Sequence, residues 1–134
     1  MRSERGSAAI AAVGVVVLGL VLMVGLAGIG QVVLAREKVV AAAEAGALAA
    51  APVTFRPFGT TGSPSAEADR LVRANGAVLV RCYCRSDPGY SPRTAIVTAR
   101  LKLAVLGIRE VTLEATAAAE FSPVAVLVEA GSRP

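Results

Sequence analysis

Two cysteines, Cys82 and Cys84, are the residues of this sequence whose type and spacing most directly suggest chemistry. They lie at the end of a stretch, AVLVRCY (residues 77–83), in which Val78, Val80 and Cys82 alternate with the other side chains, so a strand is predicted with both thiols on one face. A disulfide between such neighbours is strained in a regular strand, because their Cβ atoms are roughly 6–7 Å apart instead of about 3.5–4.5 Å.

Several interpretations of this cysteine pair stay open. Two buried thiols would suit a cytoplasmic domain, whereas outside the cell the pair would form a bridge across a local bulge or bond to another chain. A metal site would need further ligands, and the sequence contains neither a third Cys nor any His. We therefore treat Cys82 and Cys84 as candidate redox or disulfide residues and expect no metal.

The sequence lacks the residues on which most enzyme sites depend. Without His, it can build neither Ser-His-Asp nor Cys-His nucleophilic sites. Glu67 and Asp69 fall in the first turn of a predicted helix, where acids complement the helix dipole, and Glu114 shares the wet face of a strand with threonines. No phosphate loop or nucleophile elbow is present. We predict a protein that is not an enzyme, has no cofactor and takes no small-molecule substrate.

The charge pattern argues against a nucleic-acid partner. Residues 39–134 carry ten Lys and Arg against eight Asp and Glu, and the arginines are interleaved with the acids instead of being gathered on one surface. The chain has no Trp and five other aromatic residues, too few for a platform on which bases would stack. These arginines are predicted to form a solvated surface.

The largest signal is an apolar run near the N-terminus. No charged residue occurs between Arg5 and Arg36, and residues 7–35 are long enough, at about 1.5 Å per residue, to cross a hydrocarbon core of about 30 Å. The apolar region of a signal peptide is about half as long. The helical pattern continues through an Ala-rich segment, so residues 7–51 are predicted to form a transmembrane helix that extends into a stalk. A domain this small could not surround it as a core helix.

The rest of the chain predicts a small α+β domain. Residues 52–64 are rich in Pro, Gly and Thr and are expected to form a linker, followed by the domain at residues 65–121. A short amphipathic helix at about 66–75, capped by Ser63 or Ser65, is expected to cover one face of a three-stranded antiparallel sheet. The alternating face of the second strand runs from Val97 to Val105. The tail, residues 122–134, is predicted to add a strand fragment at residues 124–128.

These segments resemble a known family. An Arg-Gly-Ser start (residues 5–7), an apolar helix that ends at Arg36, and the Ala-rich AAAEAGALAAA (residues 41–51) resemble the TadE/TadG-like proteins of Flp (Tad) pilus systems. The later stretch RANGAVLVRC (residues 73–82) is similar to small TadE-like proteins of actinobacteria. The resemblance implies a minor pilin-like or assembly protein of a Flp/Tad-type pilus or secretion system, with the bilayer and other membrane proteins of that system as partners.

The sequence departs from this family in two places. Pseudopilins are cut after a Gly and carry Glu at the fifth mature position, so processing between Gly6 and Ser7 would place Ala11 where that Glu belongs. The relatives also often have a Cys before the short helix, where this chain reads GSPSAEAD (residues 62–69). The loop-closing disulfide that the family implies is therefore not expected.

The arrangement across the membrane is predicted with the N-terminus, residues 1–6, in the cytoplasm and the domain outside the cell. Arg2 and Arg5 on one side nearly balance Arg36 and Lys38 on the other, but the short N-terminal side favours this orientation. The alternative is a secreted binding domain released by signal peptidase, for which the AGA at residues 45–47 offers small residues at a cleavage site.

Overall fold

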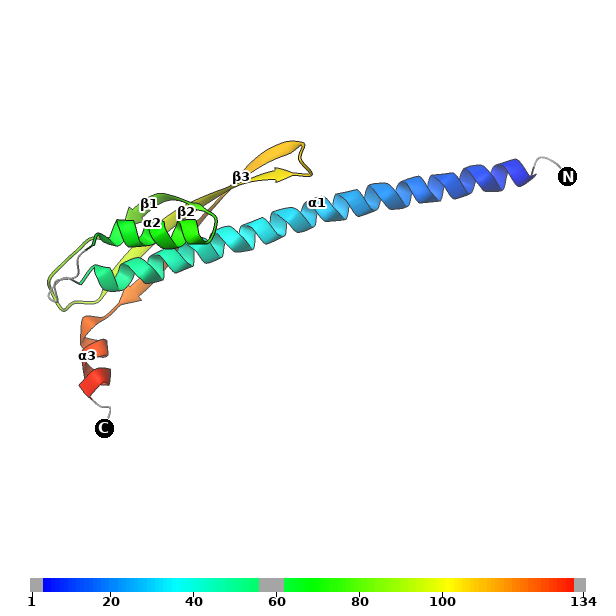
Figure 1. The fold of residues 1–134 in the computed structure, drawn as a ribbon. Helices are drawn as coiled ribbons and strands as arrows, with labels where there is room; N and C mark the ends of the chain where they lie inside the picture. Colours follow the sequence, from blue (N-terminus) through cyan, green and yellow to red (C-terminus); the bar gives the residue numbers. More distant parts are fainter. Residues whose placement is uncertain (1–3, 56–61, 132–134) are drawn as a thin grey trace.

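The computed structural model describes residues 4–55 and 62–131. It confirms the predicted α+β class: a long N-terminal helix is followed by a short helix, a three-stranded antiparallel sheet and a C-terminal helix (Figure 1). The elements, in chain order, are α1 (Glu4–Val53), α2 (Pro64–Ala74), β1 (Val78–Tyr83), β2 (Arg93–Val105), β3 (Arg109–Phe121) and α3 (Pro123–Gly131).

Helix α1 is 50 residues long, which corresponds to about 75 Å. Ala and Val are its commonest residues, and no Pro occurs before the last turn, where Pro52 lies. The helix ends just after that proline, and the Thr54 hydroxyl donates a hydrogen bond to the carbonyl of Ala51 at 2.6 Å. The first part of the predicted linker is thus helical, and its residues 56–61 lie outside the described part of the chain.

The second half of α1 belongs to the domain. The sequence predicts a stalk at residues 39–51, but the structure packs this segment into the core together with α2 and the inner face of the sheet (Figure 1). Only small side chains allow so close a contact, and alanine supplies most of them. The buried residues of α1 that share this core are Val39, Ala42, Ala43, Ala47, Ala50 and Ala51.

Strands β2 and β3 form one long hairpin in continuous register, from the pair Arg93 with Phe121 to the pair Val105 with Arg109. On the inner face, Ala95, Val97 and Ala99 are fully buried, as the predicted face of the second strand requires. The outer face is polar, and two cross-strand contacts bind the strands together. The hydroxyls of Thr98 and Thr116 lie 2.9 Å apart, and Arg100 pairs with Glu114 at 2.7 Å.

Strand β1 does not keep the simple alternation that its sequence predicts. A bulge between Leu79 and Arg81 adds an unpaired residue opposite β2 and turns the following side chains to the other face. Leu79 and Cys82 therefore both pack on the core, while Val78 and Val80, predicted to share a face with Cys82, are exposed. A pattern of seven residues could not reveal the bulge.

Helix α2 begins and ends as the sequence predicts, within two residues. The Ser63 hydroxyl accepts a hydrogen bond from the N–H of Ala66 at 3.0 Å, and Pro64 occupies the first turn. Its position is different from the prediction, because α2 lies over β1 and beside α1, whereas α1 itself covers β2 and β3. The N-terminal helix, not the short one, is thus the main cover of the sheet.

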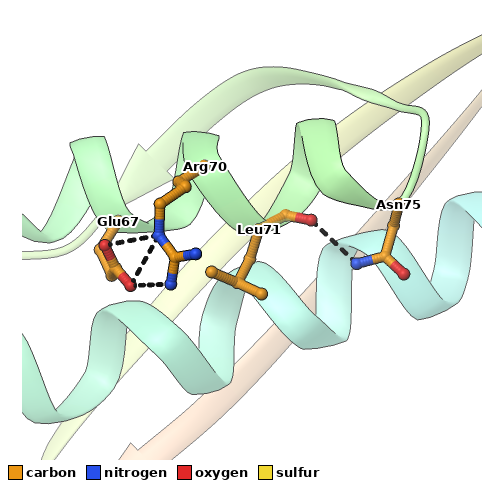
Figure 2. Close-up of polar contacts among 4 residues, drawn as sticks. All are labelled: Glu67, Arg70, Leu71 and Asn75. Carbon is orange, nitrogen blue, oxygen red and sulfur yellow. Dashed lines mark hydrogen bonds and ion pairs between the residues drawn. The ribbon is translucent and has the colours of Figure 1, made fainter.

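The solvent side of α2 is held by local polar contacts (Figure 2). The Nε of Arg70 donates to both carboxylate oxygens of Glu67 at 3.1 Å, and this hydrogen bond, helped by the positive charge, lowers the pKa of Glu67 below its ordinary value. At the other end the side-chain amide of Asn75 donates to the carbonyl of Leu71 at 2.8 Å. Gly76 follows with φ +76°, a conformation that suits glycine after a helix.

The tail is helical, and the predicted strand fragment at residues 124–128 is wrong. Pro123 occupies the first position of α3, where its fixed φ favours a helix and its missing N–H costs nothing. The chain has left the sheet at this point, so a strand would have no neighbour with which to pair (Figure 1). Four large apolar side chains of α3 are exposed, namely Val124, Val126, Leu127 and Val128.

Among the described glycines, Gly46 is the one whose neighbours lie closest to the position of an added Cβ, and substitution there provides a test of the fold. A Cβ on Gly46 would lie 2.7 Å from Cγ2 of Val72 and 3.1 Å from Cγ1 of Val97. We expect Gly46→Leu to lower the free energy of unfolding by roughly 2–3 kcal/mol through overpacking. Denaturant unfolding of the full chain in detergent would measure it.

The matched control is Ala41→Leu, an exposed position of the same helix segment, which should change stability by about 0.5 kcal/mol or less. Equal effects of the two substitutions would show that α1 does not pack on α2 and β2 at Gly46.

Candidate membrane-contact surface

The first half of α1 projects from the domain without any protein cover (Figure 1). Every described side chain from Ala9 to Ala27 is exposed, including large apolar ones such as Ile10 at 76% and Met23 at 71%. This segment measures about 28 Å, close to the thickness of about 30 Å of a hydrocarbon core. The most apolar 18-residue stretch of the helix has a mean hydropathy of 2.8, and by length and composition the helix could cross a membrane.

The protein cover of α1 begins at Gly28, where the tip of the β2–β3 hairpin reaches the helix. From Ala9 onward, Gly28 is the first buried residue of α1, and a Cβ there would contact the Leu106 side chain at 3.6 Å. Three residues further along, Oε1 of Gln31 accepts a hydrogen bond from the backbone N–H of Leu106 at 3.0 Å. The sequence contains no signal for this contact, since it joins segments 75 positions apart.

The hairpin turns through residues with left-handed backbone conformations. Gly107 has φ +70°, which glycine tolerates, but Leu106 has φ +52° and is the one non-glycine residue of the described chain with positive φ. Such a conformation is unfavourable for a branched side chain. The turn thereby places Leu106 against α1 and leaves Ile108 pointing outward at 88% exposure.

A groove lies beside the hairpin, between α1, the end of α2 and β2. It has a volume of about 610 Å³, and its walls are apolar side chains with a few polar groups: Gln31 and Lys38 from α1, Asn75 after α2, and Lys102 from β2. Lys102 also pairs with Glu110 across the hairpin at 3.0 Å. No acidic side chain lines the groove, so its polar groups would suit an anion or a polar headgroup.

Cys82 and Cys84 are joined by a disulfide, with their Cα atoms 5.4 Å apart. This distance is shorter than the span of two residues in a regular strand and falls in the ordinary range for a bridge of about 4.4–6.8 Å. Strand β1 ends at Tyr83, so Cys84 is free of strand geometry, and both cysteines pack on the edge of the core. Of the interpretations left open by the sequence, the structure agrees with a disulfide between Cys82 and Cys84 of the same chain.

At the end of the domain remote from the membrane helix, Arg93 fastens the loop after β1 to the end of α1. Its guanidinium donates to the carbonyls of Thr54, at 3.0 Å, and of Asp87 and Gly89, and lies over the ring of Phe55. The backbone N–H of Asp87 donates to the same Thr54 carbonyl at 3.0 Å. Arg93 was predicted to be one of many solvated arginines, but it is partly buried and structural.

The other sequence-predicted sites are not brought together. Gly6 and Ser7, the suggested processing position, lie in the first turns of α1, and their side chains are outside the described part. The acids of α2 pair with arginines of the same helix, Glu67 with Arg70 and Asp69 with Arg73. Within residues 4–55 and 62–131 there is no cluster of three side chains that could hold a metal ion.

The role of Arg93 can be tested by substitution. We expect Arg93→Ala to lower the free energy of unfolding by about 1.5–3 kcal/mol, because a charged donor that binds several carbonyls is lost. Arg93→Lys should recover little of this, since lysine has no planar fork of donors. Denaturant unfolding of the full chain in detergent provides the measurement.

The control is Arg100→Ala, which removes an exposed ion pair with Glu114 and should cost no more than about 1 kcal/mol. A loss at Arg93 as small as that at Arg100 would contradict the assigned role.

Comparison with known proteins identifies one part of the chain. Residues 6–52 match the family model described as putative Flp pilus-assembly TadE/G-like. No curated protein and no solved structure matches the chain. The matched residues cover nearly all of α1, both its bare half and the half in the core, while α2 and the sheet lie outside the match. The family resemblance is thus confirmed on the helix: over residues 6–52 the chain matches the TadE/G-like family of putative Flp pilus-assembly proteins.

Proposed function

We propose that this protein is a single-pass membrane component of a Flp/Tad-type pilus or secretion system, with a minor pilin-like or assembly role and no enzymatic activity. The observation that carries the proposal is α1 itself. Its first half has the length, hydropathy and bare surface of a membrane span, and its residues match a pilus-assembly family. The helix anchors the protein, and the domain meets partner proteins of the same system.

The surface of the bare half suits lateral packing against other membrane helices. A Cβ placed on Gly14, Gly19 or Gly25 would meet no atom within 4 Å apart from its own stretch of helix backbone, so a neighbouring helix could approach there. The family resemblance gives the class of neighbour, namely other membrane proteins of the pilus machine. Ala11, in place of a Glu, favours an assembly component over a processed filament subunit.

The proposed orientation has the N-terminus in the cytoplasm and the domain outside the cell. The bridge between Cys82 and Cys84 supports it, because disulfides persist in oxidising compartments and are rare in the cytoplasm.

Release of a secreted domain is the second candidate, and the packing disfavours it. Signal peptidase would have to cut near residues 45–47, in the middle of the helix segment that fills the core. Gly46 and Ala47 are buried against α2 and the sheet. A domain released there would lose Val39, Ala42 and Ala43 from its interior, whereas the anchored chain keeps its core whole.

Anchoring and orientation are tested together in cells that carry a C-terminal epitope. We expect the full-length chain in the membrane fraction, resistant to alkaline carbonate. After reduction of intact cells stripped of wall, an impermeant maleimide should label Cys82 and Cys84, and Cys82→Ser with Cys84→Ser is the control for background. A short soluble form in the medium would contradict the anchor. Labelling in lysates alone would place the domain inside.

The pilus role is tested by deletion and complementation in the native host. We expect deletion of the gene to remove most surface pili, counted by electron microscopy, and the full chain to restore them. A chain whose residues 1–27 are replaced by an unrelated membrane helix of equal length should be inserted but restore few pili, if lateral packing of α1 matters. Normal piliation after deletion would exclude the proposed function, even if the membrane anchor is confirmed.

A further inference from the structure

The hairpin tip lies at the boundary between the bare and the covered halves of α1 (Figure 1). Residues 9–27 are exposed, and Gly28 is the first that protein covers, by contact with Leu106. Since residues 9–27 already measure about 28 Å, a bilayer that holds them has its surface near Gly28. The tip of the hairpin is then level with that surface.

The tip has the chemistry of a membrane-interface residue pair. Ile108 is 88% exposed, the highest value among the exposed large apolar residues, and Leu106 is 40% exposed although its other side packs on α1. Both belong to a turn in which a glycine separates them. Exposure of so large an apolar side chain to water is unfavourable. Its transfer into the interfacial region of a bilayer lowers the free energy.

Charged residues lie next to the tip, on the strands of the hairpin and on the covered half of α1. Arg109 follows Ile108 directly, and Lys102 pairs with Glu110 at 3.0 Å on the flank of the hairpin. On α1, Lys38 lines the groove beside them. Apolar groups at the deepest point and basic groups behind them match the depth profile of a lipid headgroup layer, where Lys and Arg reach phosphate.

We propose that the β2–β3 hairpin is a second membrane contact, in which Leu106 and Ile108 enter the bilayer interface beside α1. The inference rests on the proposed membrane span of α1. Together, helix and hairpin tip hold the domain at two points and fix its tilt on the membrane. The left-handed backbone of Leu106 serves this contact, because it directs one apolar side chain to α1 and leaves the next free for lipid.

The absence of Trp from the sequence gives a clean test. Three single-tryptophan variants of the full chain are reconstituted in vesicles of phosphatidylcholine and phosphatidylglycerol that contain lipid brominated in the upper acyl chain. Ile108→Trp reports the tip, Leu18→Trp reports the bare helix, and Ala118→Trp reports the exposed outer face at the far end of β3. These side chains are exposed in the protein, so the substitutions leave the core intact.

We expect Ile108→Trp to emit at shorter wavelength than Ala118→Trp and to lose at least about half of its fluorescence to brominated lipid, as Leu18→Trp does. Aqueous acrylamide should quench Ala118→Trp the most and Leu18→Trp the least. If Leu18→Trp is quenched by lipid and Ile108→Trp is not, the hairpin contact is wrong while the anchor stands. A blue-shifted Ile108→Trp without lipid quenching would mean that protein covers the tip, which also overturns the proposal. If Leu18→Trp escapes the lipid, the proposed span itself fails, and the hairpin contact fails with it.

Discussion

The structure depends on one continuous helix, α1, whose second half lies in the protein core and whose first half is exposed. The second half of α1 packs so closely on α2 and β2 that a single added carbon on Gly46 would collide with Val72. That contact is possible because alanine and glycine line this half, so the core is thin and its largest fully buried side chains are Val39, Val72, Val97, Thr54 and Pro123. The first half carries large apolar side chains that no described part of the chain covers. Because α1 runs without interruption from one half to the other, the position of the domain is set by the direction of the membrane helix.

Two contacts far apart along the domain then hold the sheet to that helix. Near the bare half, Leu106 lies on Gly28 and donates to Gln31. At the opposite end, Arg93 binds the carbonyl of Thr54, directly after α1, and the loop that follows β1. The long β2–β3 hairpin connects these two contacts and keeps its register unbroken along its whole length. Small side chains such as alanine interlock weakly, so a sheet held only at its middle could rotate relative to α1. Contacts at both ends of the sheet restrain that rotation.

The sequence was sufficient for elements whose signals are local. The apolar run, the capped helix at Ser63 and Pro64, and the alternating face from Val97 follow from composition and period alone, and they were found within a few residues. The misplaced features depend on contacts between distant segments. No local sequence pattern predicts the bulge that turns Cys82 inward, the packing of residues 39–51 into the core, or the contact of Leu106 with Gly28. The helix of the tail was missed for another reason: a short Val-rich run fits both periods, and Pro123 decided it. Arg93 looked like any other arginine, because its partners are backbone carbonyls that no side-chain pattern can show.

A helix shared between membrane and domain also constrains what the protein can do in an assembly. A flexible linker would let a partner move the domain without moving the anchor, but here residues 39–51 are both the end of the helix and the centre of the core. In the proposed arrangement, a tilt of α1 in the membrane therefore also tilts the sheet, because no flexible joint separates the two. The matched helix, residues 6–52, thus supplies most of the surface on which the unmatched strands β2 and β3 pack.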